Sequence, residues 1–296
     1  MKRFPFRAVI IVAALIAAVF LFLERAVQRP NDSTDRGVLE RETPAPDFGP
    51  ARHGAEDPVR SIVVIIDDIG FDLRIVQKLA SIPAPIAFAV LPYTPHAGEA
   101  ARLLHAAGKE ILLHLPMESL GRPGKSPGEG ALTTDMNAEE IRDRVREILE
   151  AVPFISGVNN HMGSRFMEDE ARLAVVMEEL RAKDLFFVDS MTTETSRGRK
   201  TSERAGVRFA ARDVFIDHVP GYGAALKNLT GVLRKERMND LPILMIGHPR
   251  TETERAIRDA MPVWRTEGVQ VIPVSACFGI AHGSESGVRP QRRTER

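Results

Sequence analysis

The stretch Ile62-Val63-Val64-Ile65-Ile66-Asp67-Asp68 decides the fold class, because a short apolar run that ends in acids is typical of a buried parallel strand. Similar runs lie at 86–91, 110–115, 156–161, 185–189, 208–217, 241–247 and 269–275. Between the runs we expect helices at 72–81, 96–107, 138–150, 168–183, 223–238 and 252–266. Repeated strand–helix units of this kind predict an α/β protein with a parallel sheet and right-handed crossovers.

The number of these strands predicts one domain with a closed or nearly closed sheet. Seven or eight strands between residues 60 and 278, most of them followed by a helix, favour a single distorted (β/α)7-8 barrel. An open doubly wound sheet is the alternative. In either architecture, binding and catalytic residues gather at the carboxyl ends of the strands.

The first residues have the pattern of an export signal. Three basic residues precede an apolar run at 8–23, which would rise about 24 Å as a helix. No small-x-small cleavage site follows this run, so we favour a signal anchor over a cleaved signal peptide in residues 1–28. The basic flank would stay in the cytoplasm, which predicts an inner-membrane anchor and a periplasmic domain in the bacterial cell envelope.

Composition divides the rest of the chain into one folded domain and two polar ends. Residues 29–58 and 281–296 are rich in polar residues, Gly and Pro, and we expect them to be a disordered linker and a disordered tail around a domain at 59–280. Lys and Arg total 40 and Asp and Glu total 40, and no basic stripe crosses the domain, which argues against nucleic-acid binding. The single cysteine excludes an intrachain disulfide.

Acids and imidazoles stand at several strand ends. Asp67 and Asp68 end the first strand, His114 follows an apolar run in the third, and His161 ends the fourth. Zinc in hydrolytic sites commonly takes three protein ligands, and two histidines with one carboxylate meet that count. One aspartate of the pair could hold the metal while its neighbour accepts a proton from water. Taken singly, each residue also suits a structural role, as a turn cap or a hydrogen-bonded histidine.

Later strand ends add an acid and substrate-binding candidates. His248, in Gly247-His248-Pro249, is a candidate general acid, because an imidazole near its ordinary pKa can protonate a departing amine. Asp189 could orient His248, bind substrate or cap the following turn. Asn160 and Ser164 lie in an unusually polar strand end, and holding substrate or orienting the site would give such groups partners. Asp217 ends another strand, and we rank it below these residues.

Five motifs in order carry a family resemblance. They are Ile66-Asp67-Asp68-Ile69-Gly70, His114-Leu115-Pro116-Met117-Glu118, Asn159-Asn160-His161-Met162-Gly163-Ser164, Phe187-Val188-Asp189-Ser190 and Gly247-His248-Pro249. Together they resemble the divergent polysaccharide deacetylases, a branch related to the NodB-like carbohydrate esterases. The resemblance covers about residues 60–278 and implies a NodB-like distorted barrel that removes acetyl groups from N-acetylated sugars.

The resemblance also implies roles for single residues. Asp67 would be the general base, Asp68 and His161 metal ligands, and His248 the general acid. Typical NodB-like enzymes place a second ligand histidine where this chain has Arg165, and His114 would replace it. With export, peptidoglycan is the expected polysaccharide substrate.

Two alternatives to the deacetylase remain open. A non-catalytic envelope protein could bind glycan or a partner in the same cleft, and the missing second histidine favours it. A metal-dependent phosphoesterase would need more basic residues around the rim than these strand ends supply.

Overall fold

The computed structural model describes residues 60–121, 126–234 and 242–280. Its strands are β1 (Arg60–Ile69), β2 (Ala87–Val90), β3 (Glu110–Met117), β4 (Ile155–Met162), β5 (Phe186–Asp189), β6 (Phe209–Ala211), β7 (Val214–Phe215), β8 (Ile243–Gly247) and β9 (Val269–Val271). Its α-helices are α2 (Leu73–Ala80), α3 (Ala97–Ala106), α4 (Ala138–Ala151), α5 (Glu170–Ala182), α6 (Gly198–Ala205), α7 (Tyr222–Gly231), α8 (Thr251–Thr266) and α9 (Cys277–Ile280). Short 3₁₀ segments are η1 (Phe166–Glu168), η2 (Val232–Arg234) and η4 (Val274–Ala276).

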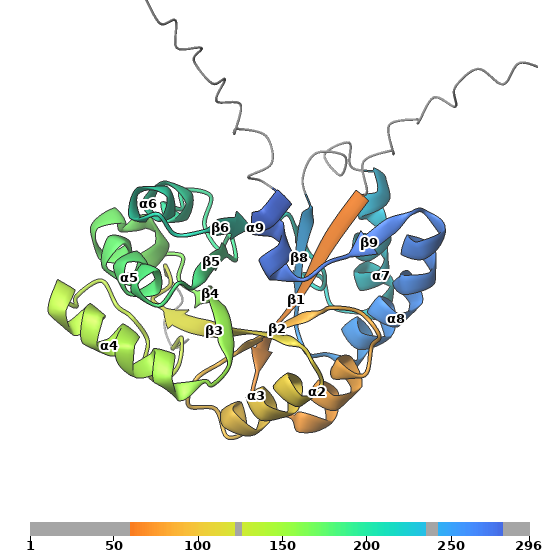
Figure 1. The fold of residues 1–296 in the computed structure, drawn as a ribbon, viewed down its shortest axis with the longest axis horizontal. Coiled ribbons are helices and arrows are strands. Elements are labelled where there is room, and N and C mark those ends of the chain that lie inside the picture. Colours follow the sequence, from red (N-terminus) through yellow and green to blue (C-terminus); the bar gives the residue numbers. More distant parts are fainter. Residues whose placement is uncertain (1–59, 122–125, 235–241, 281–296) are drawn as a thin grey trace, which may run out of the picture. The chain divides into compact units, whose positions relative to one another are not determined.

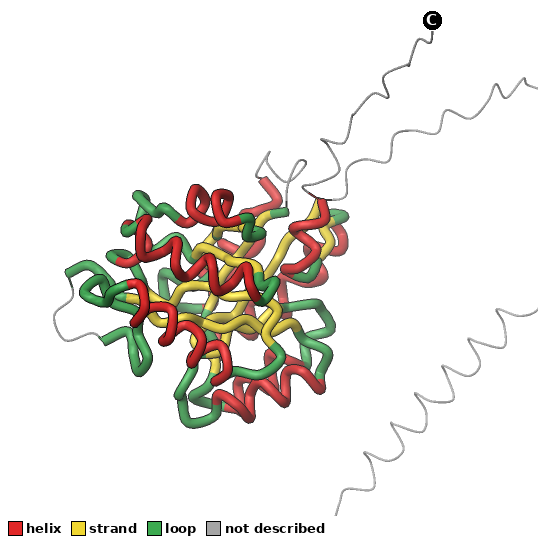
Figure 2. Tube along the Cα trace, turned by 60° about the vertical axis from the view of Figure 1, so that its left-hand side comes forward, coloured by secondary structure: helices red, strands yellow, loops and turns green. Residues whose placement is uncertain are grey.

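The strands form one curled parallel sheet in the order β6-β5-β4-β3-β2-β1-β8-β7, with β9 paired to the start of β1 (Figure 1). Every strand pairing is parallel, as expected when each strand is followed by a returning segment. Helices α2 to α8 lie around the outside of the sheet, which Figure 2 shows as strands enclosed by helices. The prediction of a parallel, curled α/β sheet is confirmed. The sheet is a half-barrel and not the closed (β/α)7-8 barrel that we expected, because β6 and β7 stand at opposite ends of the strand order and are not paired with each other in the part of the chain that the structure describes.

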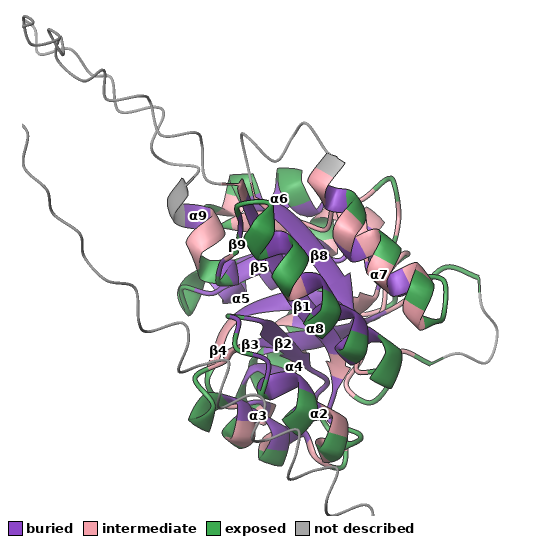
Figure 3. Cartoon of the chain, turned by 90° about the vertical axis from the view of Figure 1, so that its right-hand side faces the viewer, coloured by how far each residue is buried: buried purple, intermediate pink, exposed green. Residues whose placement is uncertain are grey.

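Apolar side chains divide into two clusters, one on each face of the sheet. The larger cluster joins the outer face to helices α2 to α8 and includes Leu79, Val145 and Ala256. The smaller cluster fills the concave face with strand residues and is covered by the C-terminal segment through Val274 and Phe278. Figure 3 shows the strands as the buried centre of the domain. With α2 to α8 all on one face, the doubly wound alternative is excluded.

The two edge strands of the sheet, β6 and β7, follow each other directly in the sequence. The backbone N–H of Arg212 donates to Asp189 O on β5, whereas that of Asp213 donates to Leu244 O on β8. The chain therefore changes partner strand within two residues. Our prediction of one strand at 208–217 was wrong for this reason, because β6 and β7 belong to opposite edges.

Most predicted helices are present within two or three residues of their expected ends, and α4 has the start signal read from the sequence. Asn137 accepts from the N–H groups of Glu139 and Glu140, and Glu140 accepts in return from the N–H of Asn137. This capping box satisfies donors that the first turn cannot pair internally. Helix α6 was missed because its sequence has no apolar stripe, and the predicted strand at 269–275 ends early, at Val271.

The predicted signal anchor, the linker at 29–58 and the tail at 281–296 lie outside the described residues. Among the helices that the structure describes, none is long and apolar enough to cross a membrane.

Candidate metal and acid–base site

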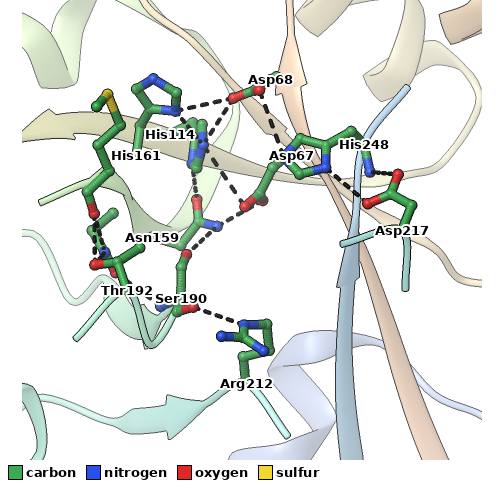
Figure 4. A network of polar contacts seen from close by, with 12 residues as sticks. Asp67, Asp68, His114, Asn159, His161, Ser190, Thr192, Arg212, Asp217 and His248 are labelled. Atoms are coloured by element: carbon green, nitrogen blue, oxygen red, sulfur yellow. Dashed lines mark hydrogen bonds and ion pairs between the residues drawn. The ribbon is translucent and has the colours of Figure 1, made fainter. Parts of the chain in front are cut away.

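Alternation along the strands brings the site residues to one face. On β1, Ile65 belongs to the concave cluster and Asp67 is the next residue on that face. On β3, Leu112 is followed in the same way by His114. The same period of two extends the concave face on other strands to Asn159, His161, Ser190 and His248. These residues meet at the carboxyl end of the curled sheet (Figure 4).

Asp68 joins its neighbour Asp67 through a local irregularity in β1. Between Ile66 and Ile69 this strand has one residue more than β2 has between Phe88 and Val90, and Asp68 adopts a φ of 56°. Such a bulge re-aims side chains that would otherwise point to opposite faces. Both carboxylates therefore reach the same site.

The turn after the bulge requires a glycine. Gly70 has a φ of 132°, and a Cβ added there would lie 1.9 Å from Oγ1 of Thr94. A side chain at this position would both strain the backbone and clash with the loop after β2.

Three ligand atoms form a nearly equilateral triangle. His161 Nδ1 lies 3.0 Å from both His114 Nε2 and Asp68 Oδ1, and His114 Nε2 lies 3.2 Å from Asp68 Oδ1. Ligands about 2.0–2.1 Å from a tetrahedral zinc ion would lie about 3.3 Å apart. Asp68 Oδ1 is buried, and no described donor meets it with hydrogen-bond geometry. The three residues therefore fit a divalent cation.

The electrostatics of the triangle favour a positive charge. Burial opposes a charge on His114, but Asp67 and Asp68 outweigh it and raise the pKa of His114 to about 9. For Asp68, burial would raise the pKa, but the contacts with His114 and His161 outweigh it and lower the pKa. The negative potential that favours a proton on His114 would also favour a metal cation held between these groups.

Asp67 lies beside the triangle and has the character of a base. Its side chain is 6% exposed, and its Oδ2 lies 3.7 Å from His114 Nε2. Burial raises the pKa of Asp67 above its ordinary value, although His114 and a hydrogen bond from Asn159 act in the opposite direction. A carboxylate with a raised pKa accepts a proton more readily than an exposed one.

His248 faces the cluster from the other side, held by Asp217. Its Nδ1 lies 2.9 Å from Asp217 Oδ1, and its Nε2 lies 3.7 Å from Asp68 Oδ2. The second oxygen of Asp217 accepts from the backbone N–H of His248 and from Thr253 Oγ1. Burial would lower the pKa of His248, but the bond and charge of Asp217 outweigh it and raise the pKa. The protonated form of the imidazole is therefore favoured relative to an exposed histidine, and in that form Nε2 can donate.

The structure does not bring the three predicted substrate-binding side chains into this cluster. Asn160 donates to Met162 O and Thr192 Oγ1 and accepts from the N–H of Ser190. Asp189 accepts from Ser196 Oγ and from the N–H of Met191. Both belong to the outer face and join loops there. Ser164 Oγ accepts from the N–H of Leu120. Their proposed contact with substrate remains a prediction.

Arg165, at the position of the usual second histidine, points to a carboxylate. Its Nη1 lies 3.4 Å from Glu118 Oε1, and the other oxygen of Glu118 accepts from the N–H and hydroxyl of Thr134. The loop after β3 is joined in this way to the loop after β4. The second histidine of the candidate metal triangle is therefore His114, and not a residue at position 165.

Three residues have larger roles in the structure than the sequence patterns indicate. Asp217, not Asp189, holds His248, and the signal was its place at a strand end beside His218. Asn159 belongs to the polar motif at the end of β4, and its amide bridges His114 and Asp67. No sequence pattern indicates a role for Arg212, whose guanidinium donates to Ser190 O and Met191 O and holds the loop after β5.

The sequence matches the model of the divergent polysaccharide deacetylases over residues 64–278. The chain belongs to this family. YibQ of Escherichia coli K12 is 32% identical over 198 residues, which are 67% of this chain and 61% of that relative. The chain thus spans less than two thirds of that protein's length. A protein of Haemophilus influenzae is 30% identical over 192 residues, which are 65% of this chain and 68% of the relative.

A solved structure supports the architecture of this family member. The crystal structure of ATU2773 from Agrobacterium tumefaciens C58 superposes with a TM-score of 0.70 at 22% identity, covering 75% of this chain and 90% of that one. This likeness concerns the fold alone.

Proposed function

We propose that this divergent polysaccharide deacetylase removes N-acetyl groups from an envelope polysaccharide of the peptidoglycan type, with a divalent metal, zinc first, as cofactor. The observation that carries the proposal is the ligand triangle of Asp68, His114 and His161, flanked by Asp67 on one side and by the His248–Asp217 pair on the other. A cation there would act as a Lewis acid toward the acetamide carbonyl and lower the pKa of water.

Asp67 supplies the base in this proposal. Its Oδ1 is held by Asn159 Nδ2 at 2.7 Å, while Oδ2 faces the ligand triangle. Because burial raises its pKa, the carboxylate gains from taking a proton from the attacking water.

His248 supplies the acid. Its Nδ1–H is committed to Asp217, so the proton on Nε2 is the one aimed at the site. Breaking the C–N bond of an amide needs a proton on the departing nitrogen, because a free amide anion is a very poor leaving group. The raised pKa of His248 favours the protonated form that this role needs.

The cellular setting is part of the same proposal. The apolar run at 8–23 would anchor the chain in the inner membrane, and the domain would face the periplasm, where peptidoglycan lies.

The test is metal content and acetate release measured on the full-length protein. We expect about one zinc ion per chain and release of acetate from peptidoglycan that stops with a chelator and returns with zinc. Zinc binding without acetate release from any N-acetylated glycan would contradict the deacetylase. Absence of both would favour the alternative of a non-catalytic protein that binds glycan or a partner in this cleft.

A further inference from the structure

Asn159 is a completely buried amide at the centre of the site. Its side chain is 0% exposed and lies between His114, Asp67 and Ser190. We propose that Asn159 is a positioning residue that sets the tautomer of the ligand His114 and ties it to the base Asp67. This inference rests on the proposed function and adds to it a link between metal binding and proton transfer.

The orientation of the amide follows from its neighbour. Asp67 Oδ1 lies 2.7 Å from one end of the amide, and in the ionised form that a base needs, a carboxylate only accepts hydrogen bonds. An amide oxygen turned toward it would face another oxygen without a proton between them. The NH₂ group therefore faces Asp67. Its nitrogen also lies 3.3 Å from Ser190 Oγ, which can accept its second hydrogen.

The amide oxygen then determines the state of His114. Asn159 Oδ1 lies 2.8 Å from His114 Nδ1, and an amide oxygen only accepts, so Nδ1 must carry the hydrogen. In a neutral imidazole this leaves the lone pair on Nε2, the atom that faces Asp68 and His161 in the ligand triangle. A metal ligand needs that lone pair. The amide thus prepares one residue as ligand and holds another as acceptor.

The two bonds can be separated by substitution. In Asn159→Asp a carboxylate can still accept from His114 Nδ1, but it loses the donor to Asp67 and places a second negative charge beside it. In Asn159→Leu, of similar volume, both bonds are lost. If the role of Asn159 were purely structural, both variants would lose zinc affinity and acetate release together.

The experiment measures zinc affinity by calorimetry, the visible spectrum of the Co²⁺-loaded protein, acetate release and thermal unfolding on full-length variants. We expect Asn159→Leu to bind zinc about 10–100-fold more weakly. Asn159→Asp should keep zinc affinity within about threefold and the wild-type Co²⁺ spectrum, because the bond to His114 survives. Acetate release by this variant should nevertheless fall by about 10²–10⁴-fold. The new carboxylate and Asp67 would hold one proton between them, so Asp67 would no longer be free to accept the proton of the attacking water.

Ser156→Ala is the matched control on the same strand. Its hydroxyl bonds Glu110 and Ile111 O at the other end of β4, and its loss should leave zinc affinity unchanged. Wild-type zinc affinity in Asn159→Leu, or equal weakening in Asn159→Asp, would overturn the inference. If the leucine variant does not fold, the aspartate variant decides alone. A further outcome is that the wild type releases no acetate while the two variants still show the expected zinc affinities, weak in Asn159→Leu and retained in Asn159→Asp. That result would contradict the deacetylase proposal but support the role of Asn159 in preparing His114.

Discussion

The two faces of the strand ends carry similar residues and use them differently. Asn159 and Asn160 are neighbours on β4, but the first bonds two site residues, whereas the second bonds backbone and hydroxyl groups of adjoining loops. Asp189, the last residue of β5, faces outward to Ser196, and Ser190, which follows the strand, faces inward to Asn159. A polar strand end therefore indicates a site. The alternation of side chains along the strand then separates residues that face the candidate site from residues that hold the surrounding loops.

Loss of a ligand on the inner face should have the largest effect. In His114→Ala we expect zinc content near zero and acetate release lower by at least about 10³-fold, because both Lewis-acid chemistry and the neighbouring charge balance are lost. Metal analysis and an acetate assay measure this. The unfolding transition should stay cooperative. Full zinc content in this variant would remove His114 from the ligand set.

Removing the base should separate catalysis from metal binding. We expect Asp67→Asn to lower acetate release by about 10²–10⁴-fold while zinc content stays near that of the wild type, since Asp67 lies outside the triangle. Parallel metal and activity measurements test this. Loss of zinc together with activity would show that Asp67, and not only Asp68, holds the metal.

The pH dependence of acetate release should depend on the pKa of His248, which Asp217 raises. His248 acts in its protonated form, so activity is lost as pH rises through its pKa. Asp217 holds that pKa above the ordinary value, and Asp217→Asn removes the charge while keeping the shape. The basic limb of the rate profile should therefore move to lower pH. A basic limb that does not move would mean that another group donates the proton.

On the outer face the expected loss is stability. Asp189→Ala leaves the half-buried donors of Ser196 and Met191 without their acceptor, which costs about 1–3 kcal/mol of unfolding free energy. Denaturant unfolding measures this, and kinetics below the transition should show an unchanged KM. A raised KM with unchanged stability would instead support the sequence-based prediction that Asp189 binds substrate.

The smallest effect is expected at the position of the missing histidine. Arg165 is 53% exposed at its side chain, and its pair with Glu118 is worth about 0–1 kcal/mol. Arg165→Ala should bind zinc as the wild type does, because His114 completes the triangle. A large drop in zinc affinity would give Arg165 a role near the metal that its geometry does not suggest.

Much of the fold was readable because buried parallel strands are short, apolar and nearly continuous. The errors fell where that signal is weak. Helix α6 has only small and polar buried residues, and β6 and β7 look like one run because nothing in the sequence records which edge each strand joins. The ligand candidates followed from strand-end acids and histidines, whereas the partners of His248 and His114 did not.

The sequence alone determined that polar residues would gather at the carboxyl ends of a parallel sheet, because local apolar runs and their spacing are properties of the chain. Tertiary structure decided which residues share a face and touch. The bulge at Asp68, the bridge through Asn159 and the choice of Asp217 over Asp189 all depend on register and curl. These arise from contacts between strands that lie roughly 20 to 180 residues apart, and no local pattern encodes them.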